Sequence, residues 1–124
     1  GARRFPTSLP ARWTALRRQA LADGMLDAAV TRRLETTMRP EPLRWSVWID
    51  RQKAAVVRGL DALEQDAPAL SGLATIGEIA IAAALGYLDF RFPDDRWRDG
   101  RPQLTAWYEP LLTGPSLAET AARD

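Results

Sequence analysis

The chain has 124 residues, of which 46% are hydrophobic and 27% are charged. These values are typical of a single folded globular domain and exclude a disordered or membrane-embedded chain. With 17 basic and 16 acidic residues the net charge is +1, so no strong field draws nucleic acid or anionic lipid to the surface. We therefore expect neither nucleic acid nor a membrane as a partner.

Cysteine and histidine are both absent from the sequence. This excludes a thiol nucleophile, an imidazole base and the usual zinc ligands, so we predict no catalytic residue and no metal site. Asp94, Asp95 and Asp99 lack the spacing and the bidentate glutamate of a calcium loop, and they predict a charged turn. We find no membrane-spanning run and no basic-then-apolar leader, and we expect a cytoplasmic protein.

The first two predicted elements are long helices, over about residues 8–38 and 42–66. The short proline-containing turn between them predicts that they lie antiparallel. Apolar residues three and four positions apart form a stripe on the first helix. The stripe consists of Trp13, Leu16, Ala20, Gly24, Val30, Leu34 and Met38.

The most informative segment extends from Thr75 to Phe92. Thr75 and Glu78 have the spacing of a capping box, in which each side chain accepts a hydrogen bond from the backbone N–H of the other residue. The helix that follows is apolar on every side, a pattern typical of a helix surrounded by other helices. It is too short to span a membrane.

Two more helices are predicted after this segment. One begins at Pro102, a favourable residue for a first turn, and Ser116 with Glu119 forms a second capping box before a short terminal helix. No segment alternates with the two-residue period of a strand. We therefore predict an all-α fold, with one helical domain over residues 1–124 that is a five-helix bundle around a buried central helix.

These segments together resemble the C-terminal helical domain of bacterial-type glutathione S-transferases. The shared features are the capped apolar helix, an Arg101-Pro102 pair followed by Trp107, and a Pro115-Ser116 pair before the last helix. Two residues depart from the pattern, because Glu78 stands where the family usually has aspartate and Gly114 replaces a common arginine. The resemblance covers nearly the whole chain and implies the fold of that domain.

Asp27 lies in the middle of the apolar stripe on the first helix. A carboxylate there either pairs with an arginine at a helix–helix contact, or meets solvent, a partner subunit or a ligand. In several transferase classes an acid four residues after the Asp of an Asp-Gly pair binds the glutathione ammonium of the other subunit. Asp23-Gly24 precedes Asp27 by that spacing, so the resemblance implies that Asp27 binds glutathione in trans, with structural pairing as the alternative.

The resemblance also implies that the first helix faces a cleft for a hydrophobic electrophile. Our candidates for that cleft are Trp13, Arg17 and Met25, although aromatic residues at helical spacing more commonly pack in a core. Trp45 and Trp48 lie on the second helix, where the family more often makes dimer contacts.

The thioredoxin-like N-terminal domain that holds glutathione in this family has no counterpart in the sequence. We therefore interpret the chain as the substrate-binding and dimerisation domain of a homodimeric glutathione transferase, with glutathione as co-substrate and no other cofactor. Alone, the chain is expected to be inactive. The alternative is a non-catalytic helical protein-interaction module of the same fold.

Overall fold

The computed structural model describes residues 9–113, and within them it contains four α-helices, three short 3-10 turns and no strand. The all-α prediction is confirmed. The fifth predicted helix, after Ser116, lies outside the described residues. In chain order the elements are α1 (Leu9–Thr37), η1 (Glu41–Leu43), α2 (Ser46–Asp66), η2 (Ala67–Ala69), α3 (Ile76–Arg91), η3 (Pro93–Asp95) and α4 (Pro102–Leu112).

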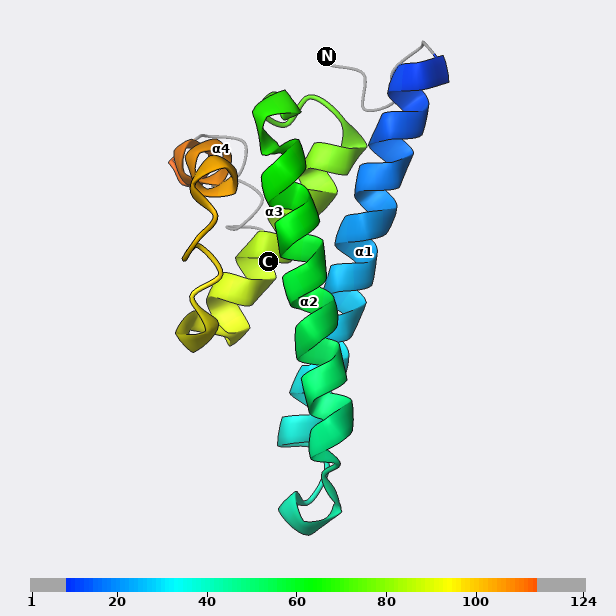
Figure 1. Ribbon diagram of the computed structural model, residues 1–124, viewed down its shortest axis with the longest axis vertical. Helices are drawn as coiled ribbons and strands as arrows, with labels where there is room; N and C mark the ends of the chain where they lie inside the picture. Colours follow the sequence, from blue (N-terminus) through cyan, green and yellow to red (C-terminus); the bar gives the residue numbers. More distant parts are fainter. Residues whose placement is uncertain (1–8, 114–124) are drawn as a thin grey trace.

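Helices α1 and α2 form the predicted antiparallel hairpin (Figure 1). Helix α2 begins at Ser46, four residues later than the predicted start at Pro42. Residues 41–43 instead form the turn η1, in which the Leu43 N–H donates to the Pro40 carbonyl at 2.9 Å. The backbone of Trp45 is extended, with φ −104° and ψ 105°, and Trp45 is the residue directly before the first turn of α2.

Helix α3 crosses behind α2 in Figure 1 and packs closely against α1. A Cβ added at Gly77 would lie 2.6 Å from the Ala15 carbonyl oxygen, so only glycine fits at this contact. The prediction of a buried central helix is confirmed for the face of α3 turned to α1 and to the hydrophobic core. The buried residues of α3 are Gly77, Glu78, Ile81, Ala82, Ala84, Leu85 and Leu88.

One flank of α3 is nevertheless exposed in this chain. Ala83 is exposed, and Phe90 near the end of the helix is 71% exposed. The apolar character of α3 on every side therefore reflects a buried face and an uncovered apolar flank, rather than burial all around.

The turn between α3 and α4 is held by an arginine. Arg98 donates to both carboxylate oxygens of Asp89, at 2.6 and 2.9 Å, and pairs with Glu109 on α4. These acids raise the pKa of Arg98, with its hydrogen bonds to Asp89 as the main cause. Beneath this pair, the Trp97 indole N–H donates to Asp89 at 2.8 Å, and the Trp97 and Tyr108 rings meet edge to face. The charged turn predicted from Asp94, Asp95 and Asp99 is confirmed.

Candidate functional site

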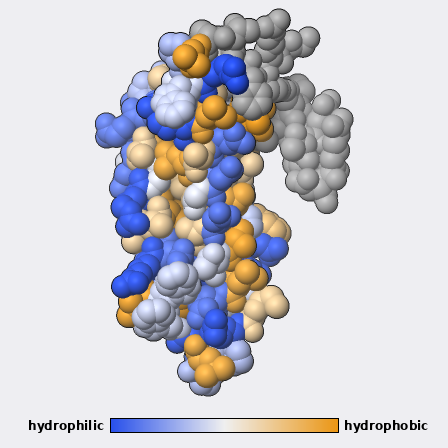
Figure 2. All heavy atoms as spheres, turned by 90° about the vertical axis from the view of Figure 1, so that its right-hand side faces the viewer, coloured by the Kyte–Doolittle hydropathy of each residue, from blue (hydrophilic) through white to orange (hydrophobic). Residues whose placement is uncertain are grey.

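The outward side of α1 carries most of the stripe that the sequence predicted, but this side lies opposite the hydrophobic core, and Val30 of the predicted stripe is half-buried. We call it the α1 outer face. Figure 2 looks at this side, where orange and pale apolar atoms lie among blue ones. The residues of the α1 outer face are all exposed, and they are Leu9, Trp13, Leu16, Ala20, Gly24, Asp27 and Leu34, with Met38 directly after the end of α1.

The core side of α1 is built mainly from alanine. Its buried residues are Ala15, Ala22, Met25, Ala28, Ala29 and Glu35. Small side chains let α1 approach its neighbours closely, so the large apolar residues are left to the other side. Helix α1 therefore has two apolar sides, one packed and one free to meet a partner or a ligand.

Asp27 is exposed in the middle of the α1 outer face. Among residues 9–113 its side chain makes no hydrogen bond or ion pair. The alternative of an arginine at a helix–helix contact is not observed there, since Arg18 pairs with Asp66 and Arg32 pairs with Asp95. An unpaired carboxylate on an apolar surface is chemically suited to accept hydrogen bonds from a cation outside this chain.

Trp13 and Arg17 lie one turn apart near the start of α1, and both are exposed, Trp13 to 70%. Trp13 is fourteen positions from Asp27, which is about 21 Å along a helix axis. The structure therefore does not bring Trp13 and Asp27 together around one small molecule. If both act, they act at different sites.

Met25 does not lie on the exposed surface. It is 3% exposed and packs against α2, where a Cβ added at Gly59 would collide with its Cγ and lie 2.6 Å from its sulfur. Met25 fills the α1–α2 contact, and we no longer assign it to a substrate cleft. Its position 25 is 120° around the helix from Trp13, which is why the two residues face opposite environments.

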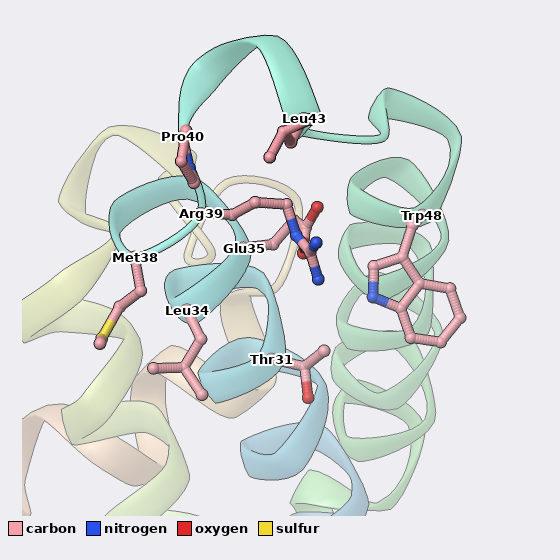
Figure 3. Close-up of a pocket in the computed structure, with 8 residues that line it drawn as sticks. All are labelled: Thr31, Leu34, Glu35, Met38, Arg39, Pro40, Leu43 and Trp48. Atoms are coloured by element: carbon pink, nitrogen blue, oxygen red, sulfur yellow. Dashed lines mark hydrogen bonds and ion pairs between the residues drawn. The ribbon is translucent and has the colours of Figure 1, made fainter.

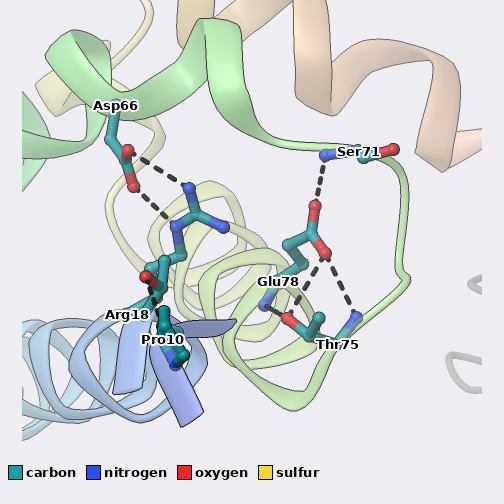
Figure 4. A network of polar contacts seen from close by, with 7 residues as sticks. Pro10, Arg18, Asp66, Ser71, Thr75 and Glu78 are labelled. Carbon is teal, nitrogen blue, oxygen red and sulfur yellow. Dashed lines mark hydrogen bonds and ion pairs between the residues drawn. The ribbon is translucent and has the colours of Figure 1, made fainter. Parts of the chain in front are cut away.

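Thr75 and Glu78 form the predicted capping box (Figure 4). Thr75 Oγ1 accepts from the Glu78 N–H at 3.4 Å, and Glu78 accepts from the Thr75 N–H at 3.1 Å. Glu78 is only 2% exposed, and its second oxygen accepts from the Ser71 N–H. Sequence reasoning missed this last contact, although a glutamate in place of the usual aspartate is the feature that permits it.

Figure 4 also shows an ion pair that joins the N-terminal part of α1 to the C-terminal end of α2. Arg18 donates to both oxygens of Asp66, at 2.6 and 3.2 Å. The hydrogen bond from Arg18 holds the pKa of Asp66 below its usual range against the opposing effect of burial, and the charge of Arg17 adds a smaller lowering.

Sequence reasoning also missed the polar residues at the connection between α1 and α2, on either side of η1. Glu35 is buried and accepts from Arg39 Nε at 2.8 Å and from the Trp45 N–H at 3.2 Å. The hydrogen bond from Arg39 lowers the pKa of Glu35, burial opposes this, and the Trp45 N–H lowers it further. The four-residue spacing of Glu35 and Arg39, just before Pro40, is the sequence feature that could have predicted this ion pair.

No group of acids in residues 9–113 is arranged to hold a metal ion, and none of the described helices is long and apolar enough to cross a membrane. Asp95 and Asp99 are instead paired with Arg32 and Arg96.

The described residues thus define an all-helical domain with a capped central helix and an unpaired acid on an exposed apolar face. Residues 46–109 match the family profile described as glutathione S-transferase, C-terminal domain. The chain therefore belongs to the glutathione S-transferase family and forms its C-terminal helical domain.

Individual relatives agree with this assignment. The chain is 35% identical over 105 residues to YibF of Escherichia coli strain K12, described as an uncharacterized GST-like protein. This match covers 82% of the chain and 52% of YibF, so the chain spans about half the length of that relative.

Solved structures resemble the chain over nearly its whole length. A glutathione transferase family member of Pseudomonas fluorescens Pf-5, with bound S-(propanoic acid)-glutathione, is 41% identical with a TM-score of 0.91, over 97% of this chain and 62% of that one. A glutathione S-transferase of Methylobacillus flagellatus KT with glutathione bound is 32% identical with a TM-score of 0.89, over 96% of this chain and 60% of that one.

Proposed function

We propose that this chain serves as the substrate-binding and dimerisation domain of a glutathione transferase that conjugates glutathione to a hydrophobic electrophile. In such an enzyme the thioredoxin-like domain would hold glutathione and ionise its thiol. The glutathione-bound relatives from Pseudomonas and Methylobacillus support the proposal.

The α1 outer face is the observation that carries this proposal. It exposes large apolar side chains over the length of α1, together with an acid that has no partner among the described residues. A monomeric protein rarely leaves so long an apolar surface uncovered. A second subunit and a thioredoxin-like domain would cover it.

We assign separate roles to the start and to the middle of this face. Trp13 and Arg17 would line the cleft for the electrophile, with the indole offering apolar area and the guanidinium a charge. Asp27 would bind the ammonium group of glutathione in the other subunit. The distance of about 21 Å along the helix between Trp13 and Asp27 fits two sites better than one.

The first prediction concerns Asp27 in a two-domain protein. This chain would be joined to the thioredoxin-like domain of the Pseudomonas relative, and conjugation of glutathione to chlorodinitrobenzene would be measured. We expect Asp27→Asn to raise KM for glutathione about tenfold with little change in kcat, since an ion pair that is kept through the reaction contributes uniform binding.

Asp23→Asn is the matched control, because Asp23 is an exposed acid one turn away and its replacement should leave KM unchanged. Equal effects of the two replacements, or none, would refute the role of Asp27. If the two-domain protein has no transferase activity at all while remaining folded, the interaction-module alternative would be the better interpretation.

A further inference from the structure

The two methionines are the only sulfur-containing residues of the chain, because cysteine is absent. They lie in opposite environments, since Met25 is 3% exposed in the α1–α2 contact and Met38 is 75% exposed. A methionine that solvent reaches is open to oxidation, whereas packing protects a buried one. The fold therefore presents the sulfur of Met38, and not that of Met25, to an oxidant.

Met38 belongs to an apolar surface at the connection between α1 and α2. Its N–H donates to the Leu34 carbonyl at 2.9 Å, so its backbone continues the last turn of α1. Figure 3 shows the side chains of Met38 and Leu34 extending to the same side. With Leu43 of η1 and Trp48 of α2 they line a groove of about 600 Å³. Met38 is the most exposed of these four apolar side chains.

Oxidation changes the chemistry of this surface. The Met38 sulfur takes one oxygen atom from hydrogen peroxide: an S–O bond forms, the O–O bond breaks, the thioether gives up two electrons, and water leaves. The resulting sulfoxide is polar, so burying it against apolar side chains without a hydrogen-bond donor costs free energy. A surface that carries the sulfoxide is therefore less suited to a contact with another protein.

We propose that Met38 is a site of reversible oxidation by a hydroperoxide, and that its sulfoxide weakens association of the chain through the α1 outer face. The inference rests on the proposed dimerisation through that face, whose last member is Met38. Oxidation and association oppose each other. A contact that covers Met38 shields its sulfur, and a sulfoxide at Met38 disfavours the contact.

Sedimentation of the full chain before and after treatment with hydrogen peroxide tests the proposal, while peptide mass measurement reports which methionine has gained an oxygen atom. We expect Met38 to be oxidised well before Met25, and the dissociation constant of self-association to rise about tenfold. Methionine sulfoxide reductases, one for each sulfoxide epimer, should restore the association. Met38 should also react more slowly at protein concentrations at which the chain is associated.

Variants assign the effect to one sulfur. Met38→Leu keeps an apolar side chain of similar size, so it should associate as the wild type does and no longer respond to peroxide. Met25→Leu is the matched control and should respond as the wild type does. Met38→Gln places a polar group at the same position and should weaken association without any oxidant.

Three results would overturn the inference while leaving the contact face in place. These are equal oxidation rates of the two methionines, oxidation of Met38 without a change in association, and a response to peroxide that persists in Met38→Leu. A chain that is monomeric before oxidation, or an association that Leu16→Asp in the α1 outer face does not weaken, would refute the proposed dimerisation and the inference with it.

Discussion

Glu78 shows how one methylene group changes the connections of a helix start. The capping box needs only the short reach from residue 78 back to Thr75, which an aspartate also spans. The longer glutamate places its second oxygen against the Ser71 N–H and so ties the loop after η2 to α3. The buried carboxylate thereby has backbone partners for both oxygens.

We predict that Glu78→Asp lowers the free energy of unfolding by about 1 kcal/mol, since it keeps the cap but leaves the Ser71 N–H without its acceptor. Urea unfolding measures this difference. Glu41→Asp, at an exposed position in η1, is the control and should change stability little. A loss no larger than that of the control would show that the Ser71 contact does not stabilise the fold.

The lowered pKa of Asp66 predicts a pH dependence of stability. A carboxyl whose pKa is lower in the folded state stabilises the protein above its unfolded pKa, near 3.8, and loses this contribution as the pH falls through the folded value. Below about pH 4 we therefore expect stability to fall more steeply in the wild type than in Asp66→Asn. Thermal unfolding between pH 6 and pH 2 checks this, and parallel pH profiles would contradict it.

At the scale of residues, the sequence indicated the groups that depend on local spacing. The capping box was predictable because both of its residues lie on one turn, and Asp27 was predictable as an acid within an apolar stripe. Ser71 and the Trp45 N–H were not predictable, because they are backbone donors that reach Glu78 and Glu35 through the folded path of loops. Met25 was misassigned because a helix with two apolar sides does not reveal which side is packed.

Helix α1 shows why side-chain size is a poor guide to the core. Its largest apolar residues face outward, while its packed side is mostly alanine. The start of α2 was predicted too early, because a proline such as Pro42 fits the first turn of an α-helix and also the 3-10 turn that the structure contains. The existence and order of the four described helices were predictable from periodicity and caps, whereas the packed side of α1 was not.

Two glycines on different elements should respond in opposite ways to alanine. At Gly24, nothing lies within 4 Å of an added Cβ, so Gly24→Ala should stabilise the chain by about 0.5–1 kcal/mol through the unfolded state. At Gly77, the added Cβ would be 2.6 Å from the Ala15 carbonyl, so Gly77→Ala should destabilise it by about 1–3 kcal/mol. Urea unfolding of both variants at low concentration measures the contrast. If both replacements stabilised the chain, the close approach of Gly77 to Ala15 would not limit the side-chain size at position 77, and the prediction would be wrong.

At the scale of the molecule, apolar surface is exposed on the α1 outer face and on the flank of α3 that bears Phe90. We predict that the isolated chain self-associates in sedimentation experiments and binds an apolar dye. Leu16→Asp should weaken the association about tenfold by placing a charge in the contact. Ala69→Asp, which adds the same charge at an exposed position in η2, should not. A single monomeric species that binds no dye would contradict this prediction.

The fit of Gly77 against Ala15 couples the motions of two helices. Packed backbones with no side chain between them leave no room for sliding, so a tilt of α1 must carry the start of α3 with it. Through Glu78, the loop at Ser71 is tied to the same rigid body. A displacement imposed on α1 from outside would therefore move the start of α3 and the loop at Ser71 together with it.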